Sequence, residues 1–354
     1  MQYFGGFLDN DGHAGLAVLE DVLFITHAGE KIGGGHLSRC IALSQAFEQK
    51  GFSCSWLLNK ESKTQAIKNN LHKVYYLDDP FHASSLSLCE SIAGNYFTVI
   101  DSYSADISLF SRMSKKSKVI AIADDIVSPP EKYLAALINY SFGAKSIMYD
   151  FVPTCSYFIG PSYALLRKDF WDVHTSNQGY VLFAPGASDV ANTAEKIVGC
   201  WQAAWPWLII ALGGFVDFDR ISKIKEIIVP QNNVSLAVDS SDFVGLMSSA
   251  AMIICTSSVT AYEALSMKKK IAVFSVVENQ SSNGEYLEKI NAAYNFGCWD
   301  TEKMSLLLPV FLKRSFDEKI LSNFVNPRGA LLCVEEITNK FNRECSYENR
   351  LCHK

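Results

Sequence analysis

Short apolar runs recur along this chain, and each ends in small or polar residues. In the first half, such runs begin at Asp21, Phe52, Lys73, Phe97, Lys118 and Ala135. The stretches between them are amphipathic. Continuous apolar runs of this length are typical of parallel strands that are buried on both faces. The pattern therefore predicts strands alternating with helices around a parallel sheet.

The same pattern starts again in the second half. Further runs begin at Gly179, Trp207, Val234, Ala251 and Lys270, and glycine, serine, asparagine or aspartate follows each of them. Two successive series predict an α/β, GT-B-like fold with two Rossmann-like domains facing across a cleft. We place the boundary in the polar stretch 167–179 and divide the chain into residues 1–170 and 171–354. Open parallel sheets bind ligands at the carboxyl ends of their strands, so the ligand is expected in the cleft.

Charge and apolar patterning narrow the function classes. The chain has 354 residues, a net charge of −5 and no long block of lysine or arginine, which disfavours nucleic-acid binding. Its amino terminus has neither an early positive charge nor an uninterrupted apolar run, so we expect no signal peptide, no membrane anchor and a cytoplasmic location. The length and the 49% hydrophobic content agree with two cores.

The cysteines do not indicate a metal site. Ten are scattered between Cys40 and Cys352 without a C-x-x-C pair. We expect reduced thiols, several of them buried as small hydrophobic residues. No metal and no cofactor is predicted.

The stretch "EKIGGGHLSRC" joins the first strand to a helix. Gly34 and Gly35 leave backbone N–H groups open at the helix start, which suits a phosphate or a crowded sugar ring. His36 is a candidate general base, and Arg39 lies on a neighbouring part of the same helical face. The alternative is an ordinary strand-to-helix turn with a capped histidine.

Two more segments end strands of the first half. Asp101, Ser102 and Tyr103 follow one strand, and Tyr103 could donate a hydrogen bond into the cleft. Asp124 and Asp125 follow the next. Because neighbouring carboxylates on an extended backbone point apart, we expect them to cap the loop, with Asp125 a candidate for orienting a catalytic group.

The second half carries a nucleotide-binding pattern. Ser257 and Ser258 lie between a strand and a helix, where hydroxyls and amides suit a diphosphate. Glu263, two turns into that helix, could bind the two hydroxyls of a ribose. Otherwise the serines are N-caps and Glu263 is a solvated helix residue. The turns "APGASD" and "ALGG" also end strands there, and backbone has to approach something closely at such positions.

Taken together, these segments resemble the PseG/SpsG family of UDP-sugar hydrolases. The signature "VLFITHAGEKIGGGHLSRC" is followed in family order by "VIDSYS", "ADD", "LINYSFGA", "YFIGPSYALLRKDF", "APGASD", "TSSVTAYEAL" and "ENQ". Two departures stand out: "PGASD" replaces a Gly-Gly-Ser/Thr-Asp turn, and "IVSPPEKY" follows Asp125 where the family has a histidine.

The resemblance implies metal-independent hydrolysis of UDP-2,4-diacetamido-2,4,6-trideoxy-β-L-altrose, with inversion and release of UDP for pseudaminic acid biosynthesis. It also implies that the second domain holds most of the nucleotide. The implied catalytic residues are His36 and Tyr103. The implied substrate-binding residues are Gly34, Gly35, Arg39, Asp125, Asn139, Tyr163 and Asn279, and the implied nucleotide-binding residues are Gly186, Ser188, Ser257, Ser258 and Glu263.

Two other functions use the same residues. A glycosyltransferase of this architecture would use His36 to activate an acceptor in place of water. A catalytically idle protein would bind the UDP-sugar and associate with another enzyme of the pathway.

Overall fold

The structure is a computed structural model. It describes residues 21–29, 32–62, 73–92, 96–124, 129–145, 149, 151–276, 280–315, 321 and 324–352, with side chains up to residue 341. Two predicted site residues, Asp125 and Asn279, lie outside the described residues.

The first half forms a parallel sheet of seven strands in the order β3-β2-β1-β4-β5-β6-β7. The strands are β1 (Asp21–Thr26), β2 (Ser53–Asn59), β3 (Lys73–Leu77), β4 (Phe97–Asp101), β5 (Lys118–Ile122), β6 (Ala136–Asn139) and β7 (Ser156–Ile159). The helices of this half are α1 (Gly35–Gln49), α3 (Leu86–Ile92) and α4 (Ile107–Met113). Short 3₁₀ turns cover Ala83–Ser85, Glu131–Tyr133, Pro161–Tyr163 and Lys168–Phe170.

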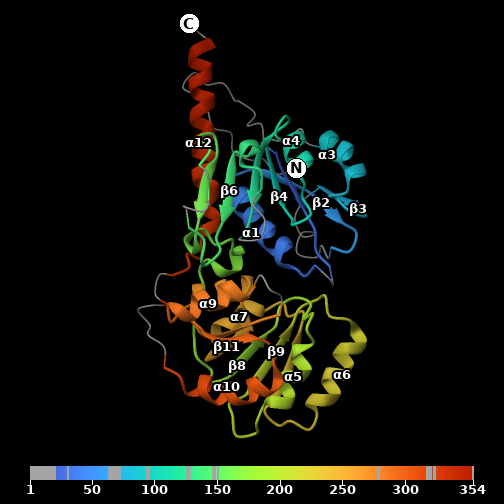
Figure 1. The fold of residues 1–354 in the computed structure, drawn as a ribbon, viewed down its shortest axis with the longest axis vertical. Helices are drawn as coiled ribbons and strands as arrows, with labels where there is room; N and C mark the ends of the chain where they lie inside the picture. Colours follow the sequence, from blue (N-terminus) through green and yellow to red (C-terminus); the bar gives the residue numbers. More distant parts are fainter. Residues whose placement is uncertain are drawn as a thin grey trace, which may run out of the picture.

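The second half forms a parallel sheet of six strands in the order β10-β9-β8-β11-β12-β13. These are β8 (Val181–Ala184), β9 (Leu208–Leu212), β10 (Val234–Val238), β11 (Met252–Thr256), β12 (Lys270–Ser275) and β13 (Tyr294–Cys298). The helices are α5 (Thr193–Cys200), α6 (Phe218–Ile228), α7 (Phe243–Ser249), α8 (Val259–Ser266), α9 (Ser281–Lys289) and α10 (Thr301–Lys313). Figure 1 shows this half below the first.

The alternation of buried residues explains the layers. Val22 and Phe24 of β1 pack into the cluster that contains α1, whereas Leu23 and Ile25 pack into the one that contains α3 and α4. Burial on both faces is what the continuous apolar runs predicted. The predicted fold of two Rossmann-like domains is confirmed, and every predicted strand is present.

Two strands, β7 and β13, were not predicted. Each lies at the edge of its sheet. Because an edge strand is only partly covered, most of their residues are half-buried or exposed, and neither has a long apolar run. The signal used for the other strands is therefore missing from both.

The last helix crosses the expected domain boundary. Helix α12 (Gly329–Cys352) leaves the second half and packs against α1 of the first, as Figure 1 shows. Phe341 contacts the ring of Phe97 in β4, with centroids 5.8 Å apart. The helix therefore adds to the core of the first sheet, although the division at residue 170 places it in the second domain.

Two composition-based expectations can be compared with the described residues. Eight cysteines have described side chains. Seven of these are buried and only Cys298 is exposed, and none of the eight forms a disulfide bond. Within this part of the chain no helix is long and apolar enough to span a membrane.

Candidate active site

A cavity of about 1040 Å³ separates the two sheets. The first half lines it with the glycine loop and with residues that follow β4, β5 and β6. The second half lines it with residues that follow β8, β9, β10, β11 and β12. Both sheets therefore present the carboxyl ends of their strands to one cleft, as the topology of open parallel sheets requires.

An aromatic stack fixes the two halves beside this cleft. Phe142, from the first half, lies parallel to Tyr262 of α8, with ring centroids 3.7 Å apart. Phe324 stacks on the other side at 5.5 Å. One hydrophobic cluster contains these rings and residues of both sheets, so the cleft walls are joined by packed core.

The glycine loop lies against the second half of the molecule. A Cβ on Gly34 would be 3.1 Å from the Cβ of Ala187 and 3.4 Å from the ring of Phe215. Gly33 has a φ of +79°, which side chains disfavour. Helix α1 begins at Gly35 without a side-chain cap, so its first N–H groups face the cleft. Glycine is thus needed here for close approach of the backbone.

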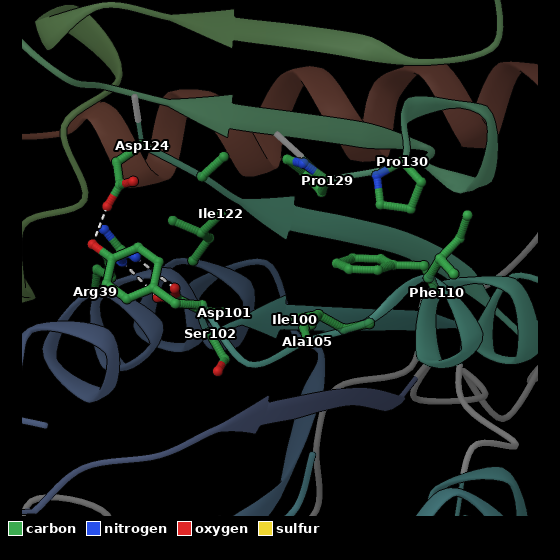
Figure 2. Close-up of a pocket in the computed structure, with 13 residues that line it drawn as sticks. Arg39, Ile100, Asp101, Ser102, Ala105, Phe110, Ile122, Asp124, Pro129 and Pro130 are labelled. Atoms are coloured by element: carbon green, nitrogen blue, oxygen red, sulfur yellow. Dashed lines mark hydrogen bonds and ion pairs between the residues drawn. The ribbon is translucent and has the colours of Figure 1, made fainter. Parts of the chain in front are cut away.

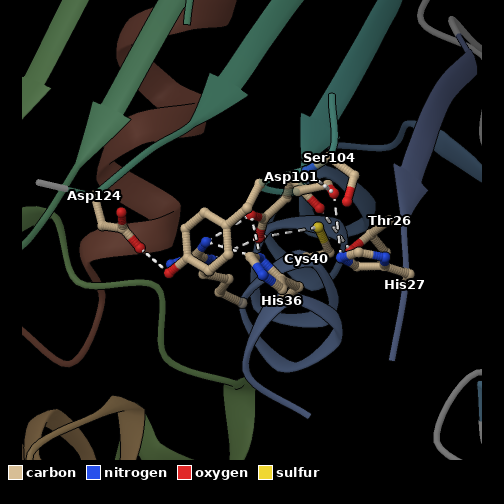
Figure 3. Close-up of polar contacts among 10 residues, drawn as sticks. Thr26, His27, His36, Cys40, Asp101, Ser104 and Asp124 are labelled. Atoms are coloured by element: carbon tan, nitrogen blue, oxygen red, sulfur yellow. Dashed lines mark hydrogen bonds and ion pairs between the residues drawn. The ribbon is translucent and has the colours of Figure 1, made fainter. Parts of the chain in front are cut away.

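His36 lies in the first turn of α1 and is held by Asp101 at the end of β4. Its Nδ1 is 2.7 Å from Asp101 Oδ1. Arg39, one turn along the helix, donates from Nε to Oδ2 at 2.5 Å and from Nη2 to Oδ1 at 2.6 Å. Figure 3 shows His36 and Asp101 together at the end of the strand.

The charges of this cluster determine its protonation. Burial alone would raise the pKa of Asp101, but Arg39 and His36 outweigh it and lower that pKa to about 2. The guanidinium is also buried, yet Asp101 raises the pKa of Arg39 well above its usual value. Nδ1 of His36 lies 2.7 Å from the ionised carboxylate and 3.0 Å from Arg39 Nη2. We assign the proton to Nδ1, with the carboxylate as its acceptor, which leaves the lone pair on Nε2.

The Tyr103 ring packs edge-on against His36, with centroids 4.8 Å apart. Its hydroxyl donates a short hydrogen bond to Asp124. Both residues line the cleft. Tyr103 therefore lies in the cleft as predicted, while Asp124, which we expected to cap its loop, is its acceptor.

Tyr140 follows β6 and lines the same wall. The residue is 4% exposed, and its hydroxyl forms no hydrogen bond of normal geometry with the described residues. Burial raises the pKa of Tyr140 to about 12, although Arg39 nearby opposes this. The hydroxyl interacts with the Arg39 side chain at the cleft wall, and it can also hydrogen-bond to a ligand there.

In the second half, α8 begins at the cleft wall. Ser258 is its N-cap residue but makes no side-chain cap bond, because its hydroxyl pairs with that of Thr256 at 2.8 Å. The first N–H groups of α8 are thus left for a ligand. Ser257 is fully buried, and its hydroxyl donates to the Gln280 carbonyl at 2.7 Å. Its backbone is also engaged, because the N–H donates to the Phe274 carbonyl and the carbonyl accepts from Asn283 Nδ2.

Glu263 lies on the cleft-facing side of α8 and is 4% exposed. Burial raises its pKa, and Arg167, with Nη2 3.6 Å from Oε1, opposes that shift. The alternative of a solvated helix residue is excluded for Glu263.

The "APGASD" turn has two roles. Gly186, with a φ of +100°, and Ser188 line the cleft. Asp189 instead accepts hydrogen bonds from the Thr193 and Ala194 amides at the start of α5, and Arg220 pairs with it. The aspartate therefore organises the turn.

Two predicted substrate-binding residues lie away from the cleft lining. Asn139 is fully buried at the end of β6, where it donates to the Tyr149 hydroxyl at 2.7 Å and accepts from the Ser141 amide. The Tyr163 ring packs edge-on against Phe158, beside the contact of its 3₁₀ turn with α12. Both side chains pack within the first half, and neither is among the residues that line the cavity.

Three cleft residues were missed or not given a role. Asp101 was seen only as a strand end, although an aspartate there, opposite a helix with His and Arg three residues apart, was a usable signal. Tyr140 and Arg167 lay in the quoted segments. Only the arrangement of the two sheets shows that they face one cavity.

Comparison with known proteins agrees with this geometry. The chain is 26% identical to the UDP-2,4-diacetamido-2,4,6-trideoxy-beta-L-altropyranose hydrolase of Campylobacter jejuni over 277 residues, covering 76% of this chain and 96% of the relative. The resemblance inferred from the motifs is thereby confirmed. No family model matches.

Solved structures of similar fold are glycosyltransferases. MurG of Acinetobacter baumannii has a TM-score of 0.58 at 14% identity, with 90% of this chain and 99% of that chain covered. The kitacinnamycin glycosyltransferase has a TM-score of 0.62 at 13% identity, with the same coverage. The spinosyn rhamnosyltransferase SpnG complexed with thymidine diphosphate has 0.58 at 12%, covering 90% and 100%. These similarities confirm the GT-B fold.

The buried His27 makes stability depend on pH. Its Nε2 is 3.1 Å from the Ser102 hydroxyl, and its ring lies 5.2 Å from that of His36. Burial, reinforced by His36, lowers the pKa of His27 from 6.5 to about 4. The unfolded chain binds this proton first, so stability falls as pH drops from about 6.5 to about 4.

We expect a loss on the order of 2–3 kcal/mol over that range. It is measured by urea unfolding at several pH values, with His27→Asn as the comparison. Equal pH dependence of the two proteins would show that His27 does not titrate in this way.

Tyr140→Phe removes a buried hydroxyl that makes no hydrogen bond of normal geometry within the described protein and interacts only weakly with Arg39. We expect the free energy of unfolding to stay the same or rise by up to about 1 kcal/mol. Tyr180→Phe is the control, because the Tyr180 hydroxyl donates to the Leu246 carbonyl at 2.7 Å and its loss should destabilise by about 1 kcal/mol. Destabilisation of Tyr140→Phe to the same extent would reveal a partner for that hydroxyl.

Proposed function

We propose that this protein hydrolyses a UDP-linked 2,4-diacetamido-2,4,6-trideoxy hexose. The reaction releases UDP and the free sugar, which we assign to nonulosonic acid biosynthesis of the pseudaminic type. The observation that carries the proposal is His36, which Asp101 holds through Nδ1 in a cleft formed by both halves. The sequence similarity to a hydrolase named for this substrate supports it.

In the proposed reaction, His36 is the general base. Its Nε2 takes a proton from a water molecule while the water oxygen bonds to the anomeric carbon. The bond from that carbon to the β-phosphate oxygen breaks, and its electron pair leaves with UDP. Attack opposite to the leaving group inverts the anomeric centre.

Asp101 acts through His36 and is a positioning residue, and Arg39 holds Asp101 in place. A carboxylate on Nδ1 keeps the imidazole in the required tautomer and stabilises the imidazolium that forms. Because Arg39 donates twice to Asp101, the carboxylate keeps its charge and its orientation during the reaction.

The diphosphate needs no strong acid to leave, so electrostatic support is sufficient. The uncapped N-terminus of α8 would support the phosphates, together with Gly186 and Ser188, and Glu263 would accept hydrogen bonds from the ribose hydroxyls. The sugar would contact the uncapped start of α1 at Gly34 and Gly35. It would also contact the hydroxyls of Tyr103 and Tyr140. The proposal requires no metal ion.

A base in this position could equally take a proton from an acceptor hydroxyl, as a glycosyltransferase requires. Incubation with the UDP-sugar alone separates the two reactions. Steady release of UDP without an acceptor supports hydrolysis, whereas release only after an acceptor is added supports transfer.

His36→Asn tests the base. We expect turnover to fall by at least about 10²-fold, the usual contribution of a general base, with UDP affinity retained. The control is His174→Asn, because His174 is exposed and lies outside the cleft lining. Normal turnover by the His36 variant would remove the histidine from the mechanism.

Glu263→Gln tests nucleotide binding. Loss of a charged acceptor in a buried position should weaken UDP binding by roughly 10- to 100-fold, while turnover of bound substrate changes little. Calorimetric titration with UDP measures the affinity, and Glu285→Gln on the exposed face of α9 is the control. Unchanged UDP affinity in Glu263→Gln would reject the ribose contact.

A further inference from the structure

A second cavity of about 260 Å³ opens beside His36, in the first half of the molecule. It lies between the ends of β4 and β5 and the start of α4. Eight of the thirteen residues that line it are apolar: Ile100, Ala105, Ile107, Phe110, Ile122, Ala123, Pro129 and Pro130. The reaction proposed above uses none of these eight.

This side cavity adjoins the main cleft. Arg39, Tyr103, Ala123 and Asp124 line both spaces, so they mark the junction between them. The Tyr103 ring that forms part of the junction also packs on His36. A substituent of a molecule bound beside the imidazole can therefore reach the side cavity through this junction.

The lining changes from polar to apolar with distance from the junction. Figure 2 shows Arg39 and Asp124 at one end, Ile122 nearby, and Phe110 and Pro130 at the other end. Phe110 is 4% exposed and Ile122 is 6% exposed, so these two belong to the packed core, whereas Ile107 is 55% exposed. A matching ligand has a polar group next to its point of attachment and an alkyl group beyond it.

We propose that the side cavity binds an N-acyl substituent of the sugar and accepts acyl chains longer than acetyl. The inference rests on the proposed function, because it assumes an amide-bearing UDP-sugar in the main cleft. An N-acyl group has the required order: the amide follows the sugar ring, and the alkyl chain follows the amide.

Each part of that substituent finds a complementary partner. The Arg39 guanidinium can donate to the amide carbonyl, and the Asp124 carboxylate can accept from the amide N–H. The alkyl chain would lie against Ile122 and Phe110, where each buried methylene strengthens binding about four-fold. A water molecule takes about 30 Å³ of the liquid, so 260 Å³ leaves room for several carbons beyond an acetyl group.

The test compares acyl lengths in the full chain. Three substrates are needed: the UDP-2,4-diacetamido sugar and the two analogues in which one acetyl group, at C2 or C4, is replaced by butanoyl. For the wild type we expect one butanoyl analogue to reach a kcat/KM at least equal to that of the diacetamido sugar. The other should fall by ten-fold or more, because only one acyl group can enter the cavity.

Ala105→Leu fills the apolar part of the cavity. We expect it to lower kcat/KM for the preferred butanoyl analogue at least ten-fold more than for the diacetamido sugar. Ser108→Leu adds the same side chain to an exposed site on α4 outside the lining, so its ratio between the two substrates should match the wild type. UDP affinity and thermal midpoint of each variant verify the fold.

The affinity of each sugar nucleotide can also be measured by its competition with UDP for binding. These affinities compare the acyl lengths without requiring turnover. If no sugar is hydrolysed but affinities follow acyl length and respond to Ala105→Leu, hydrolysis is rejected and the acyl site stands. Two results overturn the acyl site alone. In one, the diacetamido sugar is hydrolysed but kcat/KM is at least ten-fold lower for both butanoyl analogues. In the other, Ala105→Leu lowers kcat/KM equally for all three substrates. Absence of turnover and of binding overturns both proposals.

Discussion

The buried contact of Asp101 with Arg39 and His36 is the interaction on which the rest of this site depends. A carboxylate at the end of a central strand has no exposure to water, so it has to be paired where it lies. Arg39 provides the charge and His36 the third contact, both from one turn of α1. The same pairing that makes the buried aspartate tolerable fixes one nitrogen of the imidazole and leaves the other as a base.

That imidazole becomes useful because the glycine loop lets the second half of the molecule come close. Ala187 and Phe215 lie against Gly34, and the stack of Phe142 on Tyr262 holds the walls together from the other side. His36 thus faces a space in which the second half presents the start of α8 and Glu263. A sugar nucleotide in that cleft would be held at both ends, and water or an acceptor would meet the base at the sugar.

Several residues of the recognised segments have structural tasks. Asp189 caps α5, Ser257 ties its turn to Gln280, and Asn139 fixes the end of β6. Strand-end turns have to satisfy their own backbone groups before they can offer any to a ligand. The residues left for the ligand are those whose polar groups remain open, such as the Tyr140 hydroxyl and the first amides of α8. The side cavity next to Tyr103 also lies at the carboxyl ends of the strands of the first sheet. Open parallel sheets bind their ligands at these ends, so selection between substrates is expected there.

The sequence by itself determined the two parallel sheets, the glycine loop and the candidate base. Apolar runs and glycines report local conformation and burial, so β1, α1 and His36 could be placed from them. Strands β7 and β13 lack that signal because neither contains a long apolar run, unlike the other two edge strands, β3 and β10. Tertiary structure alone decided three contacts. They are the return of α12 to the first sheet, the pairing of Asp101 with Arg39, and the position of Arg167 beside Glu263. Arg39 and Asp101 are 62 positions apart in the sequence, and Arg167 and Glu263 are 96 positions apart. No local pattern encodes which distant side chains meet.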